Sequence, residues 1–219
     1  YLDKPLNTSN LNTHATAMDQ VIRSMFGLHF GNYGGDLTRW LYLVLGMGGA
    51  FLFYSGNILW IESRIKRQKN PALPLPNQRK DVRFIASLTI GACLGSILAI
   101  AASMLIGRWA YVINAELVSL NHWFMYSYYA VFLSCLIYSF IKGAGKALPQ
   151  LLISIAILLC LLPLTSFIAL LLPNMGLWSS HSSLWWIDIV AVVMAILFLR
   201  FYIQAKHRQK NIEAGSIWA

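Results

Sequence analysis

Two histidines, His29 and His122, have the type and position to support metal or redox chemistry. His29 stands just before the first long apolar run of the chain, and His122 stands at the start of the third. Neutral imidazole is a strong nitrogen ligand, and two imidazoles at one membrane depth could hold a haem iron from both faces. Each could instead ligate a separate haem with a partner elsewhere. The alternative is a pair of interfacial histidines hydrogen-bonded to loops, and spacing alone leaves these interpretations open.

The remaining three of the five histidines lie in contexts typical of exposed residues. His207 belongs to a basic stretch near the C-terminus, His181 to the serine-rich stretch 179–183, and His14 to the polar N-terminal segment. We assign no chemistry to them, and no residue is assigned a catalytic role.

Two acidic residues, Asp188 and Glu116, lie next to apolar runs, where an ionised group is costly and is often kept for a use. Either could accept a hydrogen bond from a ligating imidazole through its second nitrogen and so orient the ring. Either could equally be a charge near a helix N-terminus that complements the helix dipole, which is the simpler interpretation.

The composition places these residues in a membrane protein. Of the 219 residues, 58% are hydrophobic and 11% are charged, against roughly 25% charged in an ordinary soluble domain. The net charge of +9 comes from Lys and Arg residues that lie between apolar runs, which is typical of membrane topology. We therefore expect contact with lipid and no binding of nucleic acid.

Five apolar runs, each of about 20 residues or more, are long enough to cross roughly 30 Å of hydrocarbon. They cover residues 37–60, 84–107, 120–141, 148–172 and 185–205. Before them, apolar residues recur at helical spacing within 16–35, which predicts an amphipathic surface helix that ends in a turn of histidine and glycines. The predicted fold is all-α, with this helix preceding a transmembrane bundle over residues 36–210.

Glycines in the first two runs predict close packing of helices in the membrane, and close approach would also leave room for a flat macrocycle. They are Gly46, Gly48, Gly49 and Gly56 in the first run and Gly91 and Gly95 in the second.

The polar and basic segments set the expected topology. Of 17 Lys and Arg residues, 13 lie in 61–83, in 142–146 and from Arg200 onward, which all fall on one side of the predicted membrane. The positive-inside rule makes that side cytoplasmic, with 61–83 as a proline-containing loop and 211–219 as a tail. Residues 1–15 then form a tail on the outer side, where tryptophans and tyrosines form an aromatic belt. The chain opens at Tyr1, so we expect it to be the C-terminal part of a longer protein.

The chain resembles the PepSY-associated transmembrane family, iron-regulated membrane proteins that include ferric-siderophore reductases. The likeness rests on Leu28-His29-Phe30-Gly31, then Gly34-Gly35 and Gly46, then Ser55-Gly56-Asn57-Ile58-Leu59-Trp60 before a basic stretch. It continues more weakly through Ala115-Glu116 and Leu161-Leu162-Pro163-Leu164, from about residue 20 to residue 207 overall.

The resemblance implies a bacterial inner-membrane protein with periplasmic PepSY modules and an earlier membrane helix upstream in the same protein. It also implies that membrane histidines bind b-type haem and that electrons pass to ferric siderophore on the periplasmic side. His29 matches the family motif and would be an axial ligand, whereas His122 matches no family motif and its role rests on topology.

The first interpretation is therefore an inner-membrane oxidoreductase with haem b, with His29 as an axial ligand and His122 as the candidate for a second. The alternative is a non-enzymatic membrane anchor for periplasmic PepSY modules, or an accessory protein of iron uptake, which would hold no cofactor. A transporter ranks last because the spans show no paired ionisable residues near the middle of the membrane.

Overall fold

The computed structural model describes residues 17–31, 35–66, 76–113, 117–172, 185–211 and 216–218, and the predicted tail over 1–15 lies outside them. The chain divides into two units, Tyr1–Ser55 and Gly56–Ala219, and each is described by itself. Over the described residues the regular structure is helical, in six helices without a strand. Five of these helices are long and apolar enough to cross a membrane, which confirms the predicted all-α membrane fold.

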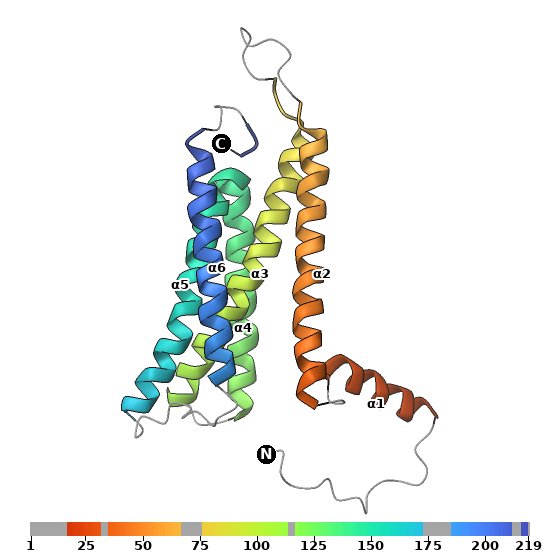
Figure 1. Cartoon of the computed structure of the whole chain (residues 1–219), viewed down its shortest axis with the longest axis vertical. Helices are drawn as coiled ribbons and strands as arrows, with labels where there is room; N and C mark the ends of the chain where they lie inside the picture. The colour runs from red at the N-terminus through yellow and green to blue at the C-terminus, as the bar shows by residue number, and fades with distance from the viewer. Residues whose placement is uncertain are drawn as a thin grey trace, which may run out of the picture. The chain divides into compact units, whose positions relative to one another are not determined.

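The first unit contains helix α1, Ala17–Phe30, and most of helix α2, Gly35–Arg64 (Figure 1). The apolar residues of α1 recur at helical spacing, as predicted for the short helix before the first span. Gly31 and Gly35, which flank the break between α1 and α2, have φ of 60° and 67°. Glycine adopts this left-handed conformation without the steric cost that a Cβ imposes, which is why the chain turns here.

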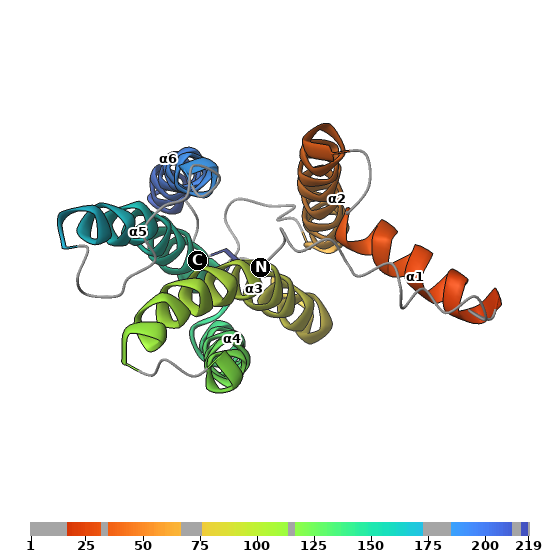
Figure 2. The same cartoon turned by 90° about the horizontal axis from the view of Figure 1, so that it is seen from below.

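The second unit is an up-and-down bundle of four helices, joined by the end of α2. They are α3 (Lys80–Ile113), α4 (Leu117–Lys142), α5 (Ala144–Leu171) and α6 (Trp185–Gln209). Helix α3 packs against α4 and α5, and α6 packs on α5 (Figure 2). We call the end where α3 and α5 finish and α4 and α6 begin the Arg108 end, and the opposite end the Lys142 end (Figure 1).

Small residues bring α3 and α4 together. A Cβ at Gly91 would meet the Ser139 side chain of α4, and a Cβ at Gly95 would lie 2.9 Å from the Cβ of Cys135. Ser139 is fully buried and donates a 2.8 Å hydrogen bond to the carbonyl of Ser87 on α3. These contacts confirm the predicted close packing at Gly91 and Gly95. In lipid, close van der Waals packing and hydrogen bonds between helices stabilise a bundle, since lipid gives no hydrophobic gain when two apolar helices meet.

The glycines of the first apolar run differ from those of the second. At Gly46, Gly48, Gly49 and Gly56 no atom lies within 4 Å of the position that a Cβ would take. The structure therefore does not show the predicted close packing at these four glycines.

The helices extend beyond the predicted apolar runs and shorten the expected loop over 61–83, since α2 continues to Arg64 and α3 begins at Lys80. The side-chain amide of Gln78 pairs with the backbone of Lys66: it accepts a 3.0 Å hydrogen bond from the Lys66 N–H and donates a 3.0 Å bond to the Lys66 carbonyl. Gln78 is buried. The amide thus ties the two ends of the connection between α2 and α3, of which residues 67–75 lie outside the described residues.

The C-terminal segment Ser216–Trp218 lies against the Lys142 end. The Trp218 indole N–H donates a 2.7 Å hydrogen bond to the Glu62 carboxylate of α2, and the Trp218 backbone lies directly over Gly145 of α5. Because Pro149 has no N–H to bond the Gly145 carbonyl one turn earlier, that carbonyl is free to accept a hydrogen bond from the side chain of Gln209. We call this group of contacts the C-terminal clasp.

Candidate functional site

His122 lies in the second turn of α4, at the Arg108 end of the second unit, and is exposed. The ring of Tyr126, four residues later, stacks on the imidazole, with 5.9 Å between ring centroids and 25° between ring planes. Residues four apart share one face of a helix, so the imidazole and phenol form a polar aromatic face on α4. Tyr126 is 64% exposed, which leaves this face open on the outside of the unit.

His29 is the penultimate residue of α1, two residues before Gly31, and its side chain is exposed. It belongs to the first unit and His122 to the second. That the two histidines share one haem therefore stays a prediction. His207 is exposed near the end of α6, whereas His14 and His181 lie outside the described residues.

Each of the exposed histidines His29 and His122 offers a nitrogen donor of the kind that an axial haem ligand supplies. Among the described residues no group of three or more His, Cys, Asp and Glu side chains could hold a metal ion. A haem needs one or two axial ligands and apolar surroundings, because the porphyrin supplies the other four nitrogens. His122 has an imidazole on an exposed face of an apolar helix, so it fits the role of one axial ligand, and a second ligand must come from elsewhere.

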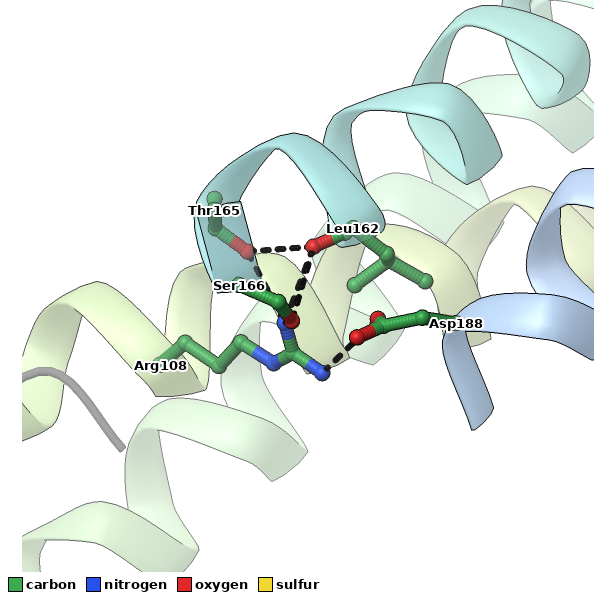
Figure 3. A network of polar contacts seen from close by, with 5 residues as sticks. All are labelled: Arg108, Leu162, Thr165, Ser166 and Asp188. Carbon is green, nitrogen blue, oxygen red and sulfur yellow. Dashed lines mark hydrogen bonds and ion pairs between the residues drawn. The ribbon is translucent and has the colours of Figure 1, made fainter. Parts of the chain in front are cut away.

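A second group of polar residues lies largely shielded from solvent at the Arg108 end (Figure 3). Nη1 of Arg108, on α3, donates hydrogen bonds to three oxygens of one turn of α5: the Leu162 carbonyl at 2.9 Å, Thr165 Oγ1 at 2.9 Å and Ser166 Oγ at 2.8 Å. Its other terminal nitrogen, Nη2, lies 3.7 Å from Oδ1 of Asp188 on α6. The Arg108 and Asp188 side chains are only 14% and 19% exposed.

The α5 turn concentrates oxygens because two hydroxyl residues, Thr165 and Ser166, stand three and four residues after Leu162 and so lie on the same face of the helix. The Thr165 hydroxyl donates a 2.7 Å hydrogen bond back to the Leu162 carbonyl, and the Ser166 hydroxyl approaches the same carbonyl at 3.4 Å. Ser and Thr in a helix commonly bond backwards in this way. Their oxygen lone pairs are thereby turned toward α3, where Arg108 lies.

The Asp188 carboxylate is largely buried, yet it lies too far from Arg108 for a hydrogen bond. Within the described part of the chain its Oδ1 is buried and has no hydrogen-bond partner. At 3.7 Å the contact with Arg108 is an ion pair beyond hydrogen-bonding distance. A buried oxygen of this kind costs desolvation free energy that no donor offsets, so it calls for an explanation.

The sequence singled out Asp188 but not its partner. The structure gives Asp188 an arginine as its charged neighbour, in place of an imidazole, and places it in the first turn of α6. Glu116 lies outside the described residues. Arg108 directly follows the predicted run 84–107 and is the one charged residue within 101–113, and this isolated charge is the signal that could have pointed to it.

The ion pair lies toward the helix ends. At 1.5 Å per residue, Asp188 is about 5 Å from the start of α6 and Arg108 about 8 Å from the end of α3. These two residues therefore do not form a pair near the middle of the membrane, which is where a transporter would be expected to have one.

His122 and Arg108 share one end of the bundle. Gly107, next to Arg108, faces the ring of Phe124, two residues after His122. The α3 turn that carries the arginine is thus the turn on which the start of α4 packs. The arginine points toward α5 and α6, while the histidine lies on an exposed face of α4.

Five long apolar helices and a buried ion pair between two of them define a helical membrane protein. Residues 5–63 of the 219 match the family described as PepSY-associated TM region, so over this segment the chain is similar to that family. The match includes α1 with His29 and nearly all of α2, and it does not extend to His122 or Arg108. Comparisons with curated proteins and with solved structures gave no match.

Proposed function

We propose that the protein is a b-type haem oxidoreductase of the bacterial inner membrane that reduces ferric siderophore on the periplasmic side during iron acquisition. The observation that carries the proposal is that His29 lies inside the PepSY-associated region, where α1 gives way to the first long apolar helix. The exposed imidazole of His122 supports it, because it offers a second axial donor from another long apolar helix.

Each histidine has a stated role in this proposal. His29 is an axial ligand, and His122 is either the second ligand of the same haem or the ligand of another. Bound haem would supply the one-electron chemistry, while the chain binds and orients it and lowers the dielectric around it. The Tyr126 ring stacks on the His122 ring and gives the imidazole an aromatic neighbour on the same helix face.

The distribution of charge supports the proposed orientation. Basic residues of the second unit gather at the Lys142 end, where the described residues include Arg79, Lys80, Lys142, Lys146, Lys206 and Arg208. At the other end, within the same described ranges, Arg108 is the basic residue, and Asp188 offsets its charge. The positive-inside rule then favours a cytoplasmic Lys142 end and a periplasmic His122. The partners in this orientation are lipid, ferric siderophore and an upstream periplasmic part of the same protein.

The test is a reduced-minus-oxidised visible spectrum of the full-length protein purified in detergent, with His29→Ala, His122→Ala and, as a matched control, His207→Ala. We expect a sharp b-type band in the wild type and in His207→Ala, and a weaker band in His29→Ala. Reoxidation of the reduced haem by a ferric siderophore would then establish the activity. No haem in the wild type after expression with ample haem would refute the proposal and favour the membrane anchor.

A further inference from the structure

We propose that one turn of α5 and Asp188 of α6 form a cation site in which the guanidinium of Arg108 is the built-in occupant, and that this site takes up a free guanidinium ion when the arginine side chain is removed. Its occupancy holds the first turn of α6 against α3. The inference does not depend on haem or on the proposed activity.

The site is lined by oxygen atoms. The Leu162 carbonyl, Thr165 Oγ1 and Ser166 Oγ all lie 2.8–2.9 Å from one nitrogen of Arg108 (Figure 3). The fourth oxygen, Oδ1 of Asp188, brings a negative charge from a different helix. Three neutral acceptors at one nitrogen and one carboxylate near the other surround a single guanidinium group, whose N–H bonds point in several directions in one plane.

The site joins three helices. Helices α3 and α6 both pack on α5, and the arginine reaches from α3 across the α5 turn to the carboxylate of α6. Without a cation, the Thr165 and Ser166 oxygens lose the donor that Arg108 supplies, and the carboxylate is left without an opposite charge in apolar surroundings. The start of α6 then has no charged tie to α3.

The unpartnered Oδ1 of Asp188 indicates that the tethered occupant does not fill the site completely. The backbone of Arg108 belongs to α3 and limits the reach of its side chain. The Nη2 atom of Arg108 therefore lies 3.7 Å from Asp188 Oδ1. A free guanidinium has no such tether, so it can move toward Asp188 and donate the direct hydrogen bond that the arginine does not make. This predicts selective uptake of guanidinium over a spherical alkali cation.

Thermal unfolding of the full-length protein in detergent tests the proposal. We expect Arg108→Ala to lower the Tm by roughly 5–10 °C, from the loss of one partner of a largely buried charged cluster. Guanidinium chloride at about 10 mM, far below the molar range in which it denatures, should restore at least half of that loss. Potassium chloride at the same concentration should not. Failure of guanidinium to rescue, or equal rescue by potassium, would overturn the proposal.

Two further variants make the test specific. Arg39→Ala removes one partner of an exposed ion pair, Arg39–Asp36, whose side chains are 61% and 86% exposed; guanidinium should leave its Tm unchanged. The double variant Thr165→Val with Ser166→Ala keeps both charges but removes two oxygens of the site, and should lower the Tm by about 3–5 °C. It covers the case in which Arg108→Ala does not fold, and an unchanged Tm in this variant would overturn the proposal.

Discussion

Gly91→Ala tests the contact between α3 and α4 most sharply. The new Cβ would lie 3.1 Å from the Cα of Leu136 and 3.1 Å from the Cβ of Ser139, and closer still to the Ser139 hydroxyl. The hydroxyl can rotate away only by giving up its hydrogen bond to the Ser87 carbonyl. The Leu136 Cα is backbone and cannot rotate, so the two helices must also separate slightly.

The cost can be worked from these contacts. Overpacking costs about 1–3 kcal/mol, and the lost buried hydrogen bond adds about 1 kcal/mol. The better helix propensity of alanine returns about 1 kcal/mol. The expected net loss in free energy of unfolding is about 1–3 kcal/mol, which lowers the Tm of a protein of this size by roughly 3–10 °C.

The assay is thermal unfolding of the full-length protein in one detergent, with Gly46→Ala as the matched control. Gly46 is also inside a long apolar helix, but no atom lies within 4 Å of its Cβ position, so alanine there should be neutral or stabilising by up to about 1 kcal/mol. In the Ser139→Ala background the hydroxyl is absent, and Gly91→Ala should cost about 1 kcal/mol less. A Tm in Gly91→Ala no lower than in Gly46→Ala, or strict additivity with Ser139→Ala, would refute the reasoning.

Three further predictions concern the Lys142 end and its connections. Gly145→Ala should displace the Trp218 backbone and lower the free energy of unfolding by about 1–3 kcal/mol, measured by urea unfolding in detergent. An unchanged urea midpoint would show that the C-terminal clasp does not stabilise the protein. Trp218→Phe keeps an aromatic ring but removes the donor to Glu62, so we expect a loss of about 1 kcal/mol in the same assay and a smaller loss in a Glu62→Ala background, where the acceptor is already absent. Gln78→Ala removes both bonds to the Lys66 backbone, and limited proteolysis should cut between α2 and α3 several-fold faster; an unaltered rate would count against that tie.

The helices could be predicted from the sequence because their signal is local. Five apolar runs of sufficient length identify five membrane helices whatever packs around them. The turn after His29 was likewise readable, since Gly31 and Gly35 take a backbone conformation that glycine favours. The glycines mark the limit of this reasoning: Gly91 and Gly95 face α4 and Gly46 faces open space, although their local sequences look alike. Which glycine meets a neighbour depends on tertiary packing.

The buried cluster could be predicted only in part. Asp188 stood out as a costly charge beside an apolar run, but its partner comes from a helix 80 residues earlier in the chain. Thr165 and Ser166 carry no sequence signal of their own, because hydroxyl residues are common in membrane helices and usually bond back to their own backbone. Only the geometry of three helices shows that their oxygens converge on Arg108.

Haem binding by His29 is tested by the ratio of haem to protein after reconstitution with equal haem. The proteins compared are purified full-length wild type, His29→Ala, His122→Ala and His207→Ala. We expect a stoichiometric haem content in the wild type and in His207→Ala. We expect a loss of at least half of it in His29→Ala, because removal of an axial imidazole weakens the binding of the iron. An equal haem content in His29→Ala and the wild type would show that His29 is not a ligand.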